Sequence, residues 1–166
     1  RSDSAGHFQF RLIPVGGVTL IADAPGLAAM AVDDLKAGDQ DVDITLPKGA
    51  TIAGKVIDGQ SGRPVSGVTL RDRSGPRPRE TETRHDGSFR LENVNSGYIR
   101  IAVADDEYLQ ESEKDITLRV REGGTSDALV IPVRRGATIR GRIVDARTGD
   151  LIGEHVIVDS LEEDAQ

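Results

Sequence analysis

The stretch GATIAGKVID at residues 49–58 decides the fold, because it recurs as GATIRGRIVD at residues 136–145. The offset between the two copies is 87 residues (136 minus 49). A shorter echo links GHFQF at residues 6–10 to GSFRL at residues 87–91, with an offset of 81 residues (87 minus 6). Self-similarity at a fixed period is the signature of a repeat architecture. We therefore expect the chain to start inside one copy, to contain a second and to stop inside a third.

These offsets predict three segments. Residues 1–48 correspond to the C-terminal half of a first β-sandwich repeat, residues 49–134 to a complete repeat, and residues 135–166 to the N-terminal half of a third. In a permuted alternative, the folding units are residues 1–85 and 86–166. A half-sandwich exposes an apolar sheet face and an unpaired edge. The terminal halves are therefore expected to complete one another, between molecules or within the chain, or to pair with the central repeat. The intermolecular version predicts self-association.

Within the complete repeat, apolar residues recur with period two, which places alternate side chains on one face of a strand. About seven short strands, separated by turns rich in Gly, Asn and Asp, indicate an all-β sandwich. Residues 25–37 contain good helix formers, so a short helix between strands is an alternative there. The predicted inward-facing set is Ile52, Val56, Val65, Val68, Leu70, Phe89, Leu91, Ile99, Ile101, Val103, Ile116, Leu118, Val120, Leu129, Ile131 and Val133.

One hairpin turn shows how the repeat is built. Asp86 and Gly87 are expected to close a hairpin that presents Phe89 to the core, since Gly adopts the positive φ of a tight turn. Phe8 follows its own hairpin glycine in the same way. We therefore expect Phe8 and Phe89 to occupy equivalent core positions in their copies.

The sequence resembles the carboxypeptidase regulatory-like domain. The shared pattern is a strand with a glycine (Gly54), a Gly-x-Pro-x-x-Gly entry to a second strand (Pro64, Gly67) and a hairpin ending in Gly-x-Phe. The matching stretches are IAGKVID (52–58), SGRPVSGVTL (61–70), TRHDGSF (83–89) and residues 91–101, which include Gly97. In this pattern Pro64 fixes φ at the sheet edge and Gly67 allows a close backbone pass. The sequence departs from the pattern at Arg84, where the family has Asp, and at Leu151, which replaces Pro64 in the third copy.

The resemblance implies a fold and a setting. It implies a tandem array of seven-stranded, Greek-key β-sandwiches of the transthyretin-like (prealbumin-like) type, with one complete repeat flanked by two partial ones. Such arrays occur in exported bacterial proteins. In zinc carboxypeptidases that carry this module, the metal belongs to a separate catalytic domain.

Composition excludes several classes of protein. The net charge of -7 argues against a nucleic-acid partner. The longest apolar run, residues 27–32, is far shorter than the roughly 18 residues of a membrane span. Cysteine is absent, so there is neither a disulfide nor a thiolate metal site. One basic stretch is interrupted by Ser, Gly and Pro, and we interpret it as a solvated loop, with an anion or partner contact as the alternative; it contains Arg71, Arg73, Arg77 and Arg79.

Catalytic patterns are also missing from the sequence. His7, His85 and His155 lie at non-equivalent positions of the three copies and lack the spacing of zinc ligands. The Gly-x-Ser-x-Gly pattern of a serine hydrolase does not occur. The sequence therefore predicts a protein that is not an enzyme and needs no cofactor.

Ligand binding is the main alternative function. Glycan sites stack sugar rings on exposed Trp or Tyr, and the sequence has no Trp. Tyr108, in an acidic loop with Asp105 and Asp106, is the candidate platform, whereas Tyr98 is expected to face the core or to start a strand. Residues 39–43 begin like an EF-hand calcium loop but lack its later Gly and Glu. A weak glycan or calcium site is therefore the alternative to a structural role.

The sequence as a whole predicts a non-catalytic structural or interaction module. We expect a spacer or presentation domain of a larger exported bacterial protein, which is secreted, at the cell surface or in the periplasm. The expected partners are neighbouring domains of the same polypeptide and an unidentified protein or glycan. A solvated, repetitive sandwich without catalytic patterns fits this role.

Overall fold

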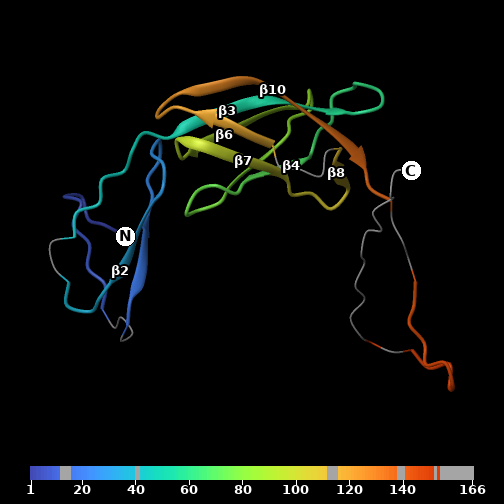
Figure 1. Ribbon diagram of the computed structural model, residues 1–166, viewed down its shortest axis with the longest axis horizontal. Coiled ribbons are helices and arrows are strands. Elements are labelled where there is room, and N and C mark those ends of the chain that lie inside the picture. Colours follow the sequence, from blue (N-terminus) through green and yellow to red (C-terminus); the bar gives the residue numbers. More distant parts are fainter. Residues whose placement is uncertain (12–15, 40–41, 112–115, 138–140, 152, 154–166) are drawn as a thin grey trace, which may run out of the picture. The chain divides into compact units, whose positions relative to one another are not determined.

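The computed structural model describes residues 1–11, 16–39, 42–111, 116–137, 141–151 and 153. The chain divides into one unit from Arg1 to Gly136 and a second from Ala137 to Gln166. The described secondary structure consists of strands β1 to β10, which confirms the all-β fold (Figure 1). In this described part of the chain, no helix is long and apolar enough to cross a bilayer.

The first segment of the larger unit contains a two-stranded sheet. Strand β1 (Val18–Ala22) pairs antiparallel with β2 (Met30–Leu35). The short helix considered for residues 25–37 is therefore wrong. The backbone groups of β2 bond to β1 across a ladder instead of to one another along a helix, which satisfies them equally well.

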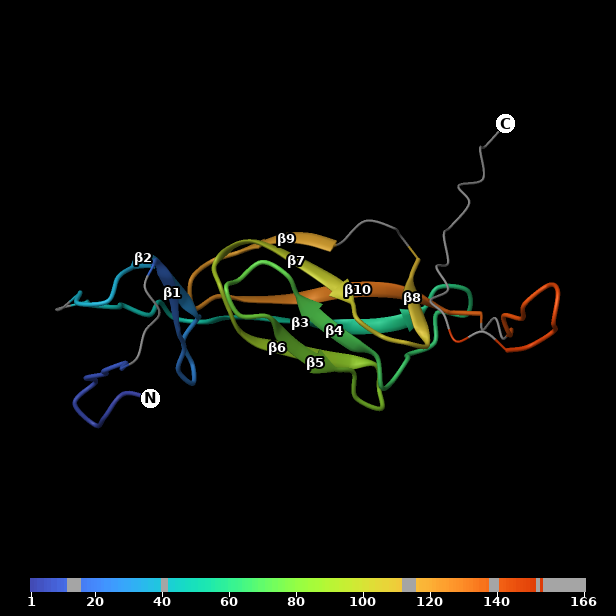
Figure 2. The same ribbon diagram turned by 90° about the horizontal axis from the view of Figure 1, so that it is seen from below.

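The complete repeat is a sandwich of two four-stranded sheets (Figure 2). The first sheet has the order β6-β3-β10-β8 and the second has the order β5-β4-β7-β9. The strands of the first sheet are β3 (Ala50–Asp58), β6 (Ser88–Val94), β8 (Tyr108–Gln110) and β10 (Thr125–Arg135). The strands of the second sheet are β4 (Thr69–Asp72), β5 (Arg79–Glu82), β7 (Gly97–Val103) and β9 (Ile116–Val120). The three-residue strand β8 adds to the seven that were expected.

The core lies between these two sheets and confirms the predicted alternation. Every residue of the predicted inward-facing set is buried in the core or packs against it. The core also takes in Ala50 and Val94, and Tyr108 packs against it. Burial of apolar area at about 25 cal/mol per Å² is the main force that holds the sheets together.

The first and last strands of the repeat run in the same direction. Strand β10 pairs parallel with β3, from Thr125 opposite Thr51 to Val133 opposite Asp58. All other pairs in the sandwich are antiparallel. Because the two strands are parallel, the chain enters the sandwich at one end and leaves it at the other (Figure 2).

The turn after the repeated strand has the same hydrogen bonds in two copies. In the second copy, Asp58 N donates to Arg63 O and Gly62 N donates to Asp58 O; in the third, Asp145 N donates to Asp150 O and Gly149 N donates to Asp145 O. Isolated bridges join Ile57 to Pro64 and Val144 to Leu151. Each position in the third copy is its counterpart plus 87, as the sequence offset requires. Leu151 therefore makes the same backbone bridge as Pro64.

The hairpin turn also recurs, at the offset of 81. Arg84 N donates to Ser88 O and Gly87 N to Arg84 O in the second copy, and Asp3 N donates to His7 O and Gly6 N to Asp3 O in the first. The two glycines have φ values of +72° and +85°. At Gly87 a side chain would also be crowded, because a β-carbon would lie 2.6 Å from the carbonyl oxygen of Val56.

Two expectations about side chains are corrected by the structure. Phe89 is 3% exposed but Phe8 is 37% exposed, so the two phenylalanines are not equivalent in burial. The described residues of the first segment lack the opposing sheet that covers Phe89. The basic stretch is a loop only in its middle, where Arg73 and Arg77 lie, because Arg71 lies in β4 and Arg79 in β5. The register places Arg71 opposite Glu80, which fixes this stretch as a hairpin.

Candidate functional site

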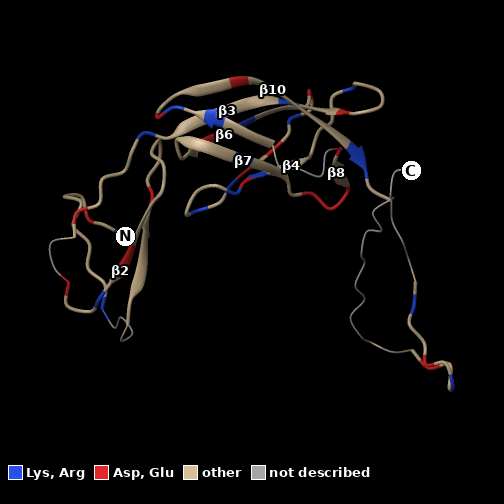
Figure 3. Ribbon diagram, in the orientation of Figure 1, with Lys and Arg blue, Asp and Glu red and all other residues tan. Residues whose placement is uncertain are grey.

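The acidic loop before β8 lines a hollow of about 430 Å³. The loop brings together the three residues that the sequence suggested as ligand candidates, and it is the red segment beside β8 in Figure 3. The residues that line the hollow are Ser66, Gly67, Thr69, Ala104, Asp105, Asp106, Glu107 and Tyr108. Whether this hollow can bind a ligand depends on which hydrogen-bond and ion-pair partners its carboxylates already have.

Asp105 is engaged by the backbone of its own loop and of β4. Its carboxylate accepts hydrogen bonds from the backbone N–H groups of Glu107 at 2.9 Å, Tyr108 at 3.0 Å and Thr69 at 3.1 Å. Burial raises the pKa of Asp105, but these three donors outweigh it and lower the pKa below 3.8. Asp105 therefore stays ionised and fixes the loop to the sandwich.

The other two candidates are placed differently. Tyr108 is half-buried and packs against the core, so its ring is not an open platform for a sugar. Asp106 is exposed, and the neighbouring Glu107 pairs with Arg135 at 3.1 Å. Among the described residues, no three His, Asp or Glu side chains gather as a group able to hold a metal ion. Ligand binding by this loop stays a prediction.

The sequence predicted that Tyr98 faces the core or starts a strand, and only the second part is correct. It starts β7 as expected, but it is 73% exposed and does not face the core. Its neighbour Ile99 and the next alternate residue, Ile101, take the inward positions, so the period of two leaves Tyr98 on the outer face. The guanidinium of Arg119 lies 6.0 Å from the centre of its ring.

Residues 51–130, which run from β3 into β10, match the family model described as the carboxypeptidase regulatory-like domain. This stretch is similar to a carboxypeptidase regulatory-like domain. The matched range lies inside the complete repeat and spans strands of both sheets. We refer to residues 50–135 as the regulatory-like domain below.

Three solved pilin structures are similar to this chain at low sequence identity. They are the major pilin subunit of Bacillus cereus (14% identity, TM-score 0.44, 55% of this chain), the pilus 2b backbone protein of group B streptococcus (16%, 0.41, 69%) and the minor pilin of Streptococcus agalactiae (16%, 0.40, 80%). The chain spans 31%, 52% and 65% of the lengths of these proteins. No curated protein matches the sequence.

The glycines of the family pattern lie where the regulatory-like domain has little room or an unusual backbone. Gly67 has a φ of +79° and only the carboxylate of Glu82 nearby, so its positive φ, not a close backbone pass, requires glycine. Gly97 has a φ of +111° where β7 begins. Gly54 lies so close to β10 that a β-carbon on it would overlap the carbonyl oxygen of Leu129.

A set of contacts fastens the first segment to the regulatory-like domain. Asp23 accepts from Arg77 at 2.7 Å and from Arg79 at 3.3 Å. The Nδ2 of Asn95 donates to the carbonyl oxygen of Ala29 at 2.8 Å. Ala28 is fully buried and its N–H donates to Pro47 O at 2.9 Å. We call these residues the junction.

The junction is tight as well as polar. Gly49 N donates to Gly26 O at 3.1 Å, and Leu27 forms a bridge with Lys48. A β-carbon on Gly49 would lie 2.6 Å from the Cα of Asn93. The chain between the first segment and the domain is therefore held by the backbone on both sides, unlike a solvated Gly/Ser linker.

Proposed function

We propose that the regulatory-like domain is a non-catalytic spacer, one member of a series of sandwiches that holds or presents other parts of a larger exported bacterial protein. The observation that carries the proposal is the parallel pairing of β3 with β10. Because the chain enters at one end and leaves at the other, each domain advances the chain by the length of a strand. Strand β3 has nine residues, which span about 30 Å at 3.3 Å per residue.

The same pairing suits a domain that carries load. A force applied between the two ends of the domain pulls β3 and β10 past one another along their length. All the ladder hydrogen bonds between the two strands then resist together, because they run across the strands and therefore across the direction of pull. The junction also supports a load-bearing role, since its contacts transmit force from the first segment into the domain without a flexible linker.

The setting of this function is also part of the proposal. We place the protein outside the cytoplasm, at the cell surface, in the periplasm or secreted, because the regulatory-like family is found as tandem copies in exported bacterial proteins. Its partners are then the neighbouring domains of the same polypeptide. The chemistry supports this use, since a sandwich built on core packing needs neither a cofactor nor a disulfide.

Single-molecule force spectroscopy on the full chain tests the proposal. The sequence has no cysteine, so handles attach only where cysteines are introduced. One variant carries Lys48→Cys with Arg135→Cys, at opposite ends of the β3–β10 ladder. It loads the ladder in shear, and we expect a high unfolding force.

The matched control carries Lys48→Cys with Thr125→Cys. Thr125 pairs with Thr51, so both handles lie at the same end of the ladder. This geometry opens the hydrogen bonds one after another, and we expect a clearly lower force at the same loading rate. Equal forces in the two geometries would contradict a load-bearing spacer.

A further inference from the structure

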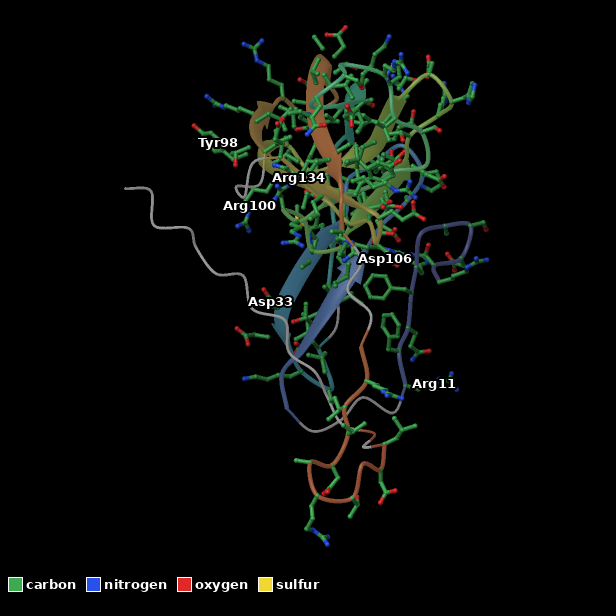
Figure 4. All side chains as sticks on the ribbon, turned by 90° about the vertical axis from the view of Figure 1, so that its right-hand side faces the viewer. Arg11, Asp33, Tyr98, Arg100, Asp106 and Arg134 are labelled. Atoms are coloured by element: carbon green, nitrogen blue, oxygen red, sulfur yellow. The ribbon has the colours of Figure 1, made fainter. Side chains whose placement is uncertain are left out.

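The outer face of the β5-β4-β7-β9 sheet carries arginines on β7 and β9 and directly after β4. Alternation places Arg73 after β4, Arg100 in β7 and Arg119 in β9 on this face, all exposed. Tyr98 lies on the same face, and the register puts it opposite Arg119. Figure 4 shows Tyr98 and Arg100 on the same side of the sandwich, pointing away from it. We call Arg73, Tyr98, Arg100 and Arg119 the arginine–tyrosine face.

Two of these arginines are direct cross-strand neighbours. The β4–β7 register pairs Asp72 with Ile101, so the next rung places Arg73 opposite Arg100. Arg73 N donates to Arg100 O at 2.9 Å, which confirms that rung. Like charges directly opposite one another on a sheet destabilise it. The repulsion between Arg73 and Arg100 therefore lowers the stability of the sheet at this position.

Two other strand arginines are paired with carboxylates. Arg71, two residues before Arg73 on the same face, pairs with Glu80 at 2.6 Å, and Arg90 on the other sheet pairs with Glu92 at 2.6 Å. No carboxylate in the described ranges forms an ion pair with Arg73, Arg100 or Arg119. In a chain with a net charge of -7, these three arginines, which have no ion-pair partner among the described residues, place positive charge on one face of this sheet.

The backbone beneath the two opposed arginines is held in place. Arg100 N donates to Ser74 Oγ at 2.5 Å, and Ser74 N in turn donates to Asp72 Oδ1 at 2.7 Å. Asp72 is only 1% exposed, so this anchor lies in the interior. The positions from which Arg73 and Arg100 project are therefore fixed before any ligand arrives, which lowers the entropy cost of binding.

We propose that the arginine–tyrosine face binds an acidic polysaccharide whose sugars carry carboxylates. Guanidinium groups form bidentate hydrogen bonds with carboxylates. The exposed ring of Tyr98, which has the Arg119 guanidinium 6.0 Å from its centre, offers an apolar surface with a polar edge, which suits the face of a pyranose ring. The site lies on a sheet surface instead of in a pocket, which fits an extended polymer.

The spacing of the side chains supports a polymer over a single sugar. Residues two apart on a strand lie about 6.6 Å apart, and adjacent strands lie about 4.8 Å apart. Arg100 is thus one such step along β7 from Tyr98, while Arg73 and Arg119 flank β7 on its two sides. Successive carboxylates of one chain can therefore meet successive guanidinium groups.

The test is a binding titration of the full chain with polygalacturonate as the acidic probe and dextran as the neutral one. We expect saturable binding of polygalacturonate and none of dextran. Arg73→Gln and Arg100→Gln should each weaken binding about tenfold, as expected for loss of one charged hydrogen-bonding partner. Tyr98→Ala should weaken it by a comparable factor. The control Arg90→Gln makes the same change of charge on the other sheet and should leave the affinity unchanged.

A second readout separates this proposal from a general attraction to anions or a folding defect. Because Arg73 and Arg100 repel one another, Arg100→Gln should keep or slightly raise the thermal midpoint while it lowers the affinity. Poly-glutamate and duplex DNA serve as competing polyanions. Equal binding of poly-glutamate together with no effect of Tyr98→Ala would overturn the polysaccharide assignment, and so would an equal loss with Arg90→Gln or no binding of polygalacturonate.

Discussion

Gly54 in β3 faces Leu129 in β10 so closely that a β-carbon on Gly54 would overlap the Leu129 carbonyl oxygen. The same β-carbon would lie 2.9 Å from Cε1 of Phe89. Ala128, just before Leu129, has a φ of +93°, and the β3–β10 register shifts at this point. The glycine therefore allows an irregular stretch of β10 to lie against β3 in the parallel pair.

Gly54→Ala should consequently destabilise the regulatory-like domain by about 1–3 kcal/mol, since overpacking forces backbone shifts. A destabilisation of this size lowers the thermal midpoint by about 4–8 °C per kcal/mol in a domain of this size. Calorimetry of the full chain measures it. Gly141 is the counterpart of Gly54 at the offset of 87, and a β-carbon there would meet nothing within 4 Å. Gly141→Ala is thus the matched control, and an equal drop in both variants would contradict the argument.

Phe89→Ala should cost about 3–5 kcal/mol, because the ring is buried against both sheets and its removal leaves a cavity. Phe8 follows the same turn in the first copy but is 37% exposed. Phe8→Ala should therefore change the unfolding free energy much less. Urea denaturation of the two variants provides the comparison. A wild-type midpoint for Phe89→Ala would place that ring at the surface.

The contrast between these two phenylalanines shows what sequence can predict here. The alternation of apolar residues predicts which side of its own strand each residue occupies, and it gave the inward set correctly. The Asp86-Gly87 turn was predicted from the residue types that tight turns require. Whether a second sheet covers that side depends on residues elsewhere in the chain, so the exposure of Phe8 was missed. The strand β2 was missed for a similar reason, since pairing with β1 outweighed the helix propensity of residues 25–37.

In the candidate sites, too, local sequence predicted some features, whereas others depend on residues far apart in the chain. Asp105 and Tyr108 were recognised as residues of one acidic loop, but the backbone donors that engage Asp105 come partly from Thr69 in another strand. The arginine–tyrosine face needs the register of β4, β7 and β9, because Arg73 is 27 positions from Arg100 in the sequence (100 minus 73). Neither pairing follows from any spacing along the chain.

Lowering the pH should weaken the hairpin turn through Asp86. The carboxylate accepts from Ser88 Oγ at 2.6 Å and from Ser88 N at 3.0 Å, and these bonds lower the pKa of Asp86 below 3.8. A group whose pKa is lowered by folding stabilises the fold above its unfolded value, and this stability is lost as the pH falls through the folded value. The loss therefore occurs below about pH 3.8.

Ser88→Ala removes the strongest of these bonds and should raise the pKa of Asp86 towards 3.8. The titration is followed by the NMR shift of the Asp86 side-chain carboxyl carbon. Asp58, which is held by Ser61 in its own turn, is the internal reference because Ser88→Ala leaves it untouched. A pKa of Asp86 that does not move would show that the hydroxyl makes no contribution.

The last prediction concerns the apolar side of the first segment. Phe8 and Phe10 line a hollow of about 540 Å³ together with apolar residues that include Leu20, Val42, Ile44 and Leu46. At the two sequence offsets these residues correspond to Phe89, Leu91, Ile101, Leu129, Ile131 and Val133, all of which are buried in the core of the regulatory-like domain or pack against it. We therefore expect the hollow to be the core side of a partial sandwich, which a first strand like β3 would complete.

Residues 136–145 have the sequence of that first strand, so we expect molecules to associate by placing this segment of one copy against the hollow of another. Light scattering should show a dimer or open chain at high concentration, because a strand that enters the hollow would bury the two exposed rings and pair with free edges. Deletion after Gly136 should restore the monomer, and a peptide of residues 136–147 should compete with association. A clean monomer of the intact chain at high concentration would rule out the intermolecular arrangement.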